Sequence, residues 1–559
     1  MALEINSVSP VNSDVVRRTA NFPPPLWGDR FASFSVDRKV MGRYDEDIKT
    51  LKVTVKKLLM ASTNEPLKNV GLIDVLCSLG VSYHFESEIA QQLASAFDSL
   101  TSLVDALGFD LYGVANLFRL FREHGHIMPC DVFEKFRDSD GKFKEALIGD
   151  AKGMLSLYEA CQLAMNGEQI LDDALTFTKS RLESLSTATD QSSPHLAKLI
   201  RSALHRPLNK CIPRLAARQF ISFYEQDESK NDTLLKFAKI DFNRLQLLYQ
   251  EELYQLTKWY RNLDISANLT YARDRIVEVY FCWAFAVYFE PQFSKARMIV
   301  SKAVEVMSII DDTYDVYGTI EELRIFTDAI QRMNLDVVDE LPEYMKCVYQ
   351  TLLNLFDEWD DELTKEGLSY NTSYTRDSFK ELVRAYHVEA EWCNKGYVPG
   401  VEEYMSNALT SSCYTAIAMC CFIGMGELAG NEAFEWVKAL PKMQVANQEI
   451  CRLINDTVSH EAEQKRGHVA SFIECYMKQY NVSEKEAVEA SNKRVDCAWK
   501  SLNDDFMNQT SHMSMAVLMR IVNLARSVEV GYRYDDGYTN PEESLKFHID
   551  SLLIQPIPM

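Results

Sequence analysis

Two oxygen-rich stretches in the second half of the chain have residue types and spacings that could hold a metal ion. The first, Ile309–Asp315 (sequence IIDDTYD), ends a long apolar run. On a helix, Asp311 and Asp315 lie on one face, one turn apart, with Asp312 beside them. Carboxylates this close in apolar surroundings repel one another and are costly to bury unless a cation neutralises them. Mg²⁺, a hard ion that prefers oxygen, is the natural partner; the alternative is the acidic start of a solvated helix.

The second stretch follows about 140 residues later and offers a different set of oxygen ligands. Asn455, Ser459 and Glu463 recur every four residues, which keeps an amide oxygen, a hydroxyl and a carboxylate on one helical face. A solvated polar face would show the same spacing. The pairing of two such faces, each preceded by apolar residues, favours a facing pair of helices in a bundle core.

Arginines and aromatic residues accompany both stretches. Arg273 and Arg275 precede the helix predicted to carry Trp283, and Arg452 lies three residues before Asn455. The guanidinium fork suits bidentate recognition of phosphate oxygens, although a surface ion-pair loop would explain any single arginine. Aromatic side chains near the predicted pocket would pack a core or together form a π-rich wall that stabilises a hydrocarbon cation. These are Trp283, Tyr314, Tyr414, Tyr532, Tyr534 and Tyr538.

Composition excludes several other classes of protein. The 559-residue chain is 47% apolar, and its net charge of −22 argues against a nucleic-acid or anionic-membrane binder. Its 13 cysteines form no CxxC pair, which indicates reduced thiols. No HExxH, GxSxG or phosphate-binding glycine loop occurs.

Neither a signal peptide nor a membrane span is expected. The N-terminus has no apolar signal-peptide core, and the apolar stretch 414–425 is too short to span a bilayer. We therefore expect a cytoplasmic protein, and we expect it to be a monomer.

The hydrophobic pattern predicts an all-α protein of two domains. Apolar residues recur at three and four throughout, strand-like alternation is absent, and Gly and Pro are sparse. We expect an extended segment over 1–40, because Pro23–Pro25 exclude helix, a non-catalytic helical domain over 41–228, and a catalytic helical domain over 229–559. In the last of these we expect helices over 234–260, 275–289, 293–317, 320–332, 341–365, 376–394, 401–430, 444–466, 483–506 and 514–532.

With these residues together, the chain resembles the plant class I terpene synthases, and specifically the cytosolic sesquiterpene synthases. The resemblance covers nearly the whole length and rests on five motifs in order. They are Arg17-Arg18 with Phe22–Pro24 and Trp27–Asp29, the RxR loop Arg273–Arg275, the DDxxD motif Asp311–Asp315, the second metal motif Asn455/Ser459/Glu463, and the C-terminal loop Asp536–Thr539.

The resemblance implies a catalytic α-barrel behind a catalytically silent helical N-terminal domain. It implies three Mg²⁺ ions, with Mn²⁺ as a substitute, bound by Asp311, Asp312, Asp315, Asn455, Ser459 and Glu463. It implies catalytic roles for Arg273, Arg275, Trp283, Arg452, Tyr532, Asp536 and Tyr538, with the three arginines on the diphosphate. It implies substrate contacts from Arg273, Asp311, Asp315, Arg452, Asn455, Ser411, Ser412 and Tyr414, where Ser411–Cys413 mark the family's helix break.

The activity implied is Mg²⁺-dependent ionisation of farnesyl diphosphate, cyclisation of the cation to a C15 hydrocarbon or alcohol, and release of diphosphate. Three alternatives stay open: a monoterpene synthase on geranyl diphosphate, a chain-elongating prenyltransferase, and a non-catalytic helical interaction protein. An elongase would carry a second DDxxD-type motif, whereas the second cluster here is NDxxSxxxE.

One departure from the family pattern concerns Trp283. The family commonly runs RDRxxExYFW, whereas Cys282 intervenes here between Phe281 and Trp283. One extra residue turns a helix by roughly 100°. We expect the extra residue to be absorbed nearer the RxR loop, because the spacing from Trp283 to Asp311 resembles that of the family.

Overall fold

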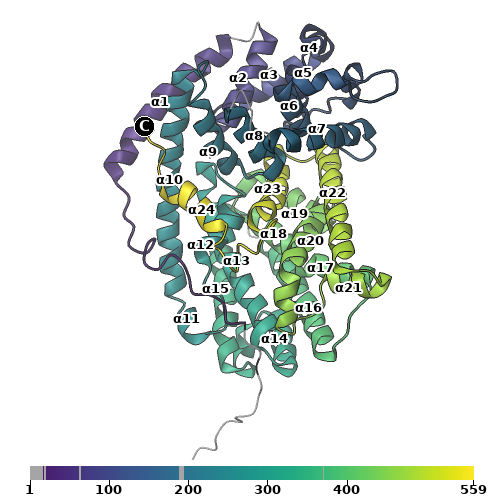
Figure 1. Cartoon of the computed structure of the whole chain (residues 1–559). Helices are drawn as coiled ribbons and strands as arrows, with labels where there is room; N and C mark the ends of the chain where they lie inside the picture. Colours follow the sequence, from purple (N-terminus) through teal and green to yellow (C-terminus); the bar gives the residue numbers. More distant parts are fainter. Residues whose placement is uncertain (1–16, 18–19, 62–64, 188–193, 369–370, 511) are drawn as a thin grey trace, which may run out of the picture.

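The computed structural model describes residues 17, 20–61, 65–187, 194–368, 371–510 and 512–559, which are helical almost throughout (Figure 1). Within these ranges no β-strand occurs, and one isolated antiparallel bridge joins Arg137 and Phe143. The predicted all-α fold is confirmed. Residues 1–16, Arg18 and residue 19 of the expected extended segment lie outside the described residues.

The first half of the chain forms a bundle of short helices at the upper end of the molecule (Figure 1). Its α-helices are α1 (Arg38–Ala61), α2 (Pro66–Ser78), α3 (Glu86–Asp98), α4 (Leu100–Leu107), α5 (Leu111–Glu123), α6 (Ala151–Cys161), α7 (Gln169–Thr187), α8 (Pro194–His205) and α9 (Pro213–Tyr224). Short 3₁₀ helices connect them: η1 (Ser82–Phe85), η2 (Cys130–Phe136), η3 (Glu145–Gly149) and η4 (Leu208–Lys210).

The second half begins with the long helix α10 (Asp232–Arg261), which the Asn231 side chain caps. Its next α-helices are α11 (Ile265–Asn268), α12 (Ile276–Val279), α13 (Ser294–Asp312), α14 (Ile320–Arg332), α15 (Glu343–Glu366), α16 (Asn371–Lys395) and α17 (Val401–Ser411). The remaining α-helices are α18 (Tyr414–Ile423), α19 (Asn431–Lys438), α20 (Lys442–Lys465), α21 (Phe472–Tyr480), α22 (Glu484–Gln509), α23 (Met515–Gly531) and α24 (Leu545–Ile549). Shorter 3₁₀ and π turns are η5 (Tyr280–Phe285), η6 (Pro291–Phe293), η7 (Thr313–Tyr317), η8 (Leu335–Glu340), η9 (Gly426–Leu428) and η10 (Asp550–Ile554).

A turn between α9 and α10 separates the two halves close to the boundary predicted at 228. They are nevertheless joined by packing. Helix α1 lies along α10, the C-terminal turn η10 also packs on α10, and one apolar core runs through both halves. The predicted boundary at 228 thus falls at a turn in the chain, and the apolar core continues across it.

The predicted helix 401–430 is two helices. A break at Ser412–Cys413 divides α17 from α18, and Cys413 has φ of 61°, in the left-handed region that a non-glycine residue seldom adopts. Val401–Ile423 is long and apolar enough to cross a membrane by length and composition, but 67% of the most apolar window is buried inside the protein. That burial is typical of a core helix.

One buried ion pair ties α13, the helix that carries the first aspartates, to α10. Arg297 donates to both carboxylate oxygens of Glu252 at 2.8 and 2.7 Å and also to the carbonyls of Tyr288 and Glu290. Tyr280 and Ser294 donate to the same carboxylate. The pair is stable because every polar atom around it has a partner, whereas removing one member leaves a buried charge uncompensated.

We expect Arg297→Met to lower the free energy of unfolding by about 3–5 kcal/mol, because Glu252 would stay buried without its cation. Urea unfolding followed by circular dichroism measures the loss. The matched control is Arg332→Met, whose ion pair with Glu340 is exposed and screened by solvent, so its loss should change the stability little. Equal losses in the two variants would contradict the assignment of the buried pair as a fold-determining contact.

Candidate active site

A cavity of about 450 Å³ opens among the helices of the second half. Its walls come from the end of α13, from α16, from the α17–α18 break, from α20 and from the segment after α23. Nearly all predicted site residues line this one cavity: Arg273, Trp283, Asp311, Asp312, Asp315, Ser411, Ser412, Tyr414, Arg452, Asn455, Ser459, Glu463, Tyr532, Asp536 and Tyr538. Arg275 is absent from the lining.

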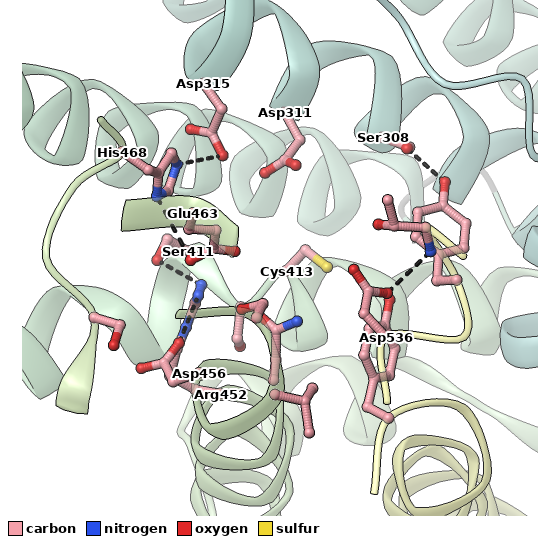
Figure 2. Close-up of a pocket in the computed structure, with 18 of the residues that line it drawn as sticks. Ser308, Asp311, Asp315, Ser411, Cys413, Arg452, Asp456, Glu463, His468 and Asp536 are labelled. Atoms are coloured by element: carbon pink, nitrogen blue, oxygen red, sulfur yellow. Dashed lines mark hydrogen bonds and ion pairs between the residues drawn. The ribbon is translucent and has the colours of Figure 1, made fainter. Parts of the chain in front are cut away.

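The first wall is the end of α13 and the π turn η7 that continues it. Asp311 and Asp315 project into the cavity, with side chains 30% and 27% exposed (Figure 2). Burial and repulsion by Asp315 raise the pKa of Asp311 to about 8, even though Arg273 opposes the shift. A cation that enters the cavity would stabilise the ionised form of this carboxyl group.

Asp312, the third predicted metal ligand, is turned away from the cavity centre. Its side chain is 1% exposed and accepts hydrogen bonds from the Arg273 backbone N–H at 2.8 Å and from Arg273 Nε at 3.2 Å. The Arg273 guanidinium also reaches Asp311 at 3.0 Å. In this structure Asp312 therefore holds the arginine loop, and Asp311 and Asp315 are the carboxylates open to a metal.

The second wall is α20, which faces the first across the cavity (Figure 2). Asn455, Ser459 and Glu463 all line it, as their spacing predicts, and the buried Ser459 hydroxyl has no hydrogen-bond partner within the described chain. Arg452 is fixed by the Ala408 carbonyl at 3.3 Å and the Ser411 hydroxyl at 3.1 Å.

His468 joins the two walls, and the sequence motifs did not single it out. Its Nε2 lies 2.9 Å from Asp315 and its Nδ1 lies 3.7 Å from Glu463 (Figure 2). Burial lowers the pKa of the imidazole, but Asp315, Glu463 and Glu389 outweigh that effect and raise it to about 10. A protonated His468 thus supplies the positive charge between the two carboxylates.

Aromatic rings form the side of the cavity away from His468. Trp283 packs edge-to-face on Tyr538 with ring centroids 5.1 Å apart, and the Tyr538 hydroxyl contacts the Ser308 hydroxyl at 2.6 Å. The extra residue Cys282 is absorbed within the π turn η5, a one-turn widening that accommodates one additional residue. As expected, Trp283 lines the cavity. The extra residue is accommodated beside the tryptophan and not near the RxR loop, where we expected it.

The α17–α18 break lies between the two sides. The Cys413 side chain projects into the cavity between Asp311 and Asp536 (Figure 2). Burial raises the pKa of the thiol well above its usual value, so the group is neutral and weakly polar. Backbone strain at a non-glycine residue with positive φ is typical of positions whose geometry serves a site.

Arg275 has a different role from the predicted contact with diphosphate. Its side chain is 1% exposed and donates to four carbonyl oxygens, those of Pro23, Asp274, Tyr538 and Thr539, at 2.7 to 3.2 Å. In this structure the Arg275 guanidinium does not reach the cavity, because these carbonyls occupy its N–H groups. Arg275 instead holds the N-terminal segment and the C-terminal loop together.

The N-terminal segment lies across the mouth of the cavity. Phe22 lines it and lies under the Arg273 guanidinium at 4.9 Å. Further back, Arg17 donates to both Glu322 oxygens at 2.9 Å and to the Tyr317 carbonyl, directly after the first aspartate motif. In the C-terminal loop, the Asp536 carboxylate accepts from the Thr539 backbone N–H at 2.9 Å.

Several cavity residues escaped the sequence reasoning. Glu389 on α16 belongs to no motif, and its carboxylate reaches the cavity by accepting from the Ser411 hydroxyl. Asp456 stands next to Asn455 in the sequence but bonds Tyr404 and the Phe472 N–H. The sequence does place His468 near the second metal motif, because it follows Gly467 a few residues after Glu463.

The residues present fit a divalent metal, although no three His, Cys, Asp or Glu side chains converge on one point in the part of the chain described. Hard oxygen donors face each other across the cavity, and the buried Ser459 hydroxyl has no hydrogen-bond partner in the described chain. The raised pKa of Asp311 means that its ionised form is unfavourable there, and a bound cation would stabilise that form. The donors Asp311, Asp315, Asn455, Ser459 and Glu463 would hold such an ion, with other oxygens completing its shell.

Comparison with known proteins agrees with this geometry. Residues 261–501 match the model of the terpene synthase family metal-binding domain, and residues 26–204 match that of the terpene synthase N-terminal domain. The chain belongs to the terpene synthase family. It is a carbon–oxygen lyase acting on prenyl diphosphates, with a divalent metal as cofactor.

Relatives match over almost their whole length. "Probable terpene synthase 6" of Ricinus communis is 48% identical, covering 98% of this chain and 99% of the relative. A valerianol synthase of Camellia hiemalis is 46% identical over 98% of both chains, and the chloroplastic casbene synthase of Ricinus communis is 47% identical over 97% and 89%. The isoprene synthase from grey poplar leaves, solved with three Mg²⁺ ions and dimethylallyl-S-thiolodiphosphate, superposes with a TM-score of 0.86 at 32% identity over 93% and 98%.

We expect His468→Leu to make this terpene synthase more dependent on metal for its stability. Removing the cation between Asp315 and Glu463 leaves the two carboxylates without their nearest positive charge, so a bound metal would relieve more repulsion than in the wild type. The Tm of the metal-free variant should fall below that of the wild type, and saturating Mg²⁺ should raise it by a larger increment. Differential scanning calorimetry with and without Mg²⁺ measures both shifts.

The control for this measurement is His512→Leu, at an exposed position outside the cavity, which should behave as the wild type. An equal Mg²⁺-induced shift in His468→Leu and the wild type would show that His468 does not compensate the metal-ligand carboxylates.

Proposed function

We propose that this terpene synthase acts on farnesyl diphosphate and folds the resulting C15 cation into a terpene hydrocarbon or alcohol. The observation that supports it most directly is that two kinds of group line one cavity. Oxygen ligands and arginines form one part of the lining, the rings of Trp283, Tyr532 and Tyr538 form another, and Arg273 packs on the Tyr538 ring where the two parts meet. Such a cavity separates the departing anion from the hydrocarbon that must be protected.

On the polar side, Arg273 and Arg452 are placed to bind diphosphate oxygens. Arg273 lies in the lining already paired with Asp311 and Asp312, and Arg452 is held rigidly by α17. The C–O bond of the substrate breaks with its electron pair leaving on the diphosphate oxygen. A divalent metal on the facing carboxylates would neutralise that leaving group, and the fixed arginines stabilise the developing charge without reorganisation.

On the apolar side, Trp283, Tyr532 and Tyr538 present π systems that attract positive charge. Burial raises the pKa of Tyr532 and Tyr538 well above the usual value, so both phenols stay neutral and do not attack the cation as phenolates. The edge-to-face contact of Trp283 with Tyr538 fixes the orientation of both rings.

Segments from both ends of the chain are placed to limit the entry of water. Arg275 links the Pro23 carbonyl to the carbonyls of Tyr538 and Thr539, so the N-terminal segment and the C-terminal loop cover the mouth together. A site closed in this way delays capture of the cation by solvent.

The relatives differ in the chain length of the product they make. The valerianol synthases and the hedycaryol synthase among the relatives make C15 products, which supports farnesyl diphosphate. The casbene synthase makes a C20 product at similar identity and favours geranylgeranyl diphosphate as the second candidate. We further propose a cytoplasmic monomer, in keeping with 13 cysteines that all carry free thiols.

The test is incubation of the purified protein with Mg²⁺ and farnesyl, geranyl or geranylgeranyl diphosphate, with volatile and hexane-extracted products read by gas chromatography–mass spectrometry. We expect C15 products and diphosphate release from farnesyl diphosphate without isopentenyl diphosphate, lost with EDTA and restored by Mg²⁺ or Mn²⁺. Turnover of only the C10 or C20 substrate would overturn the chain-length assignment.

We expect Asp311→Ala to lower kcat by roughly a thousandfold or more, because the first wall would lose its most exposed carboxylate for the metal. Steady-state assays measure the loss, and an unchanged circular dichroism spectrum shows that the fold persists. Asp339→Ala, at an exposed position outside the cavity, is the matched control. A near-normal rate for Asp311→Ala at ordinary Mg²⁺ would mean that the metal ligands are wrongly assigned.

A further inference from the structure

A second and larger cavity, of about 700 Å³, lies between the two halves of the molecule. Its lining shares no residue with the active site. The N-terminal half contributes α2, α3, α5 and α9, and the C-terminal half contributes α23 and the segment from Phe289 to Phe293. Figure 1 shows α23 where it meets the N-terminal bundle. The proposed function makes no use of this cavity.

One part of the cavity is apolar. Ile89 and Leu93 of α3 and Met515 and Met519 of α23 line it, together with Leu428, which is 55% exposed. Methionine side chains are flexible and adapt their shape to a ligand. This surface can accept a hydrocarbon chain without leaving a polar group unpaired.

Most of the charged residues that line the cavity are paired with one another. Arg119 binds Asp74 and, at 2.8 Å, Glu123, and Arg520 binds both oxygens of Glu290 at 2.8 and 3.2 Å. The remaining acid, Glu86, is exposed. Acids outnumber bases among these groups, so they would not attract an anion, and its binding depends on the other arginines of the lining.

Two arginines of the lining have fewer bonds to acids. Arg214 is 2% exposed and forms its buried ion pair with Asp241 through Nη1 alone, at 3.4 Å, while its Nε and Nη2 are buried with no hydrogen-bond partner in the described chain. Asp241 also accepts from Tyr83 and lies 2.9 Å from His84, so its oxygens are shared among several groups.

Arg526 is the second such arginine. It donates to the Asn209 carbonyl at 2.9 Å and to the amide oxygens of Asn523 and Asn209 at 3.0 and 3.4 Å, and it forms no ion pair among the residues that the structure describes. Burial lowers the pKa of its guanidinium. Arg526 is half-buried, all its hydrogen bonds go to neutral oxygens, and Glu123 is the acid that acts on it from a distance, so a bound anion would give the guanidinium a direct ionic partner.

We propose that this interdomain cavity binds an amphipathic anion, whose small carboxylate or phosphate head lies on Arg214 and Arg526 and whose hydrocarbon chain lies on the wall between α3 and α23. The site is independent of the chemistry in the active site. Because it spans both halves, a bound ligand stabilises their packing.

Isothermal titration calorimetry of the full chain with dodecanoate, below its critical micelle concentration, tests the proposal, and dodecyl phosphate in parallel assigns the head group. We expect saturable binding at one site and a rise in Tm. Acetate, which lacks the chain, and dodecanol, which lacks the charge, should bind at least about tenfold more weakly.

Two variants locate the ligand. Arg526→Met removes one of the two cations and should weaken binding about tenfold or more, and Ala516→Trp should block the cavity from α23. The matched control is Arg494→Met, which removes an arginine paired with Glu449 outside the cavity and should bind as the wild type. Product formation should be unchanged in all three.

Three results would overturn the proposal. One is the absence of saturable binding of either amphiphile to the wild type. The second is undiminished binding in both Arg526→Met and Ala516→Trp. The third is loss of binding in Asp311→Ala, which would place the amphiphile in the active site.

Discussion

The repulsion between carboxylates on opposite walls of the cavity is the constraint on which the rest of the site depends. Asp311 and Asp315 on one helix and Glu463 on another cannot approach in an apolar interior unless positive charge lies between them. The protein supplies part of that charge itself: Arg273 holds Asp311 and Asp312, and His468 bridges Asp315 and Glu463. The site is therefore assembled, with its ligands in place, before any metal or substrate enters.

Closure of the site depends on a residue that does not line it. Arg275 uses a buried guanidinium to connect the carbonyl of Pro23, 252 positions before it, with those of Tyr538 and Thr539, 263 and 264 positions after it. Trp27 adds a second link, because its indole N–H donates to Glu278 on the short helix α12, which begins directly after Arg275. The two ends of the chain are thereby attached to the element that carries the arginine loop, so movement of that loop on substrate binding would be transmitted to both covering segments.

Much of the fold and the donor set could be predicted from periodicity. Four-residue spacing places Asn455, Ser459 and Glu463 on one face of α20, and the helix predicted over 320–332 is found at those bounds. Spacing does not say which partner a side chain meets. Asp312 was expected beside Asp311 at a metal and instead accepts from Arg273, and Arg275 was expected at the diphosphate and meets four carbonyls. Those outcomes depend on loops that only the tertiary structure brings together.

Local departures from regular helix were the other feature that the sequence pattern did not predict. The π turn at Tyr280–Phe285 and the positive φ of Cys413 are both unfavourable in isolation, and surrounding packing maintains them. Each places one side chain in the cavity: the first orients Trp283 despite the inserted Cys282, and the second directs Cys413 between the two walls. Regular helices build the two facing walls, and the two irregular turns decide the contour of the space between them. Because the path of a bound cation follows that contour, the product of this terpene synthase depends on the residues that the helical pattern describes least well.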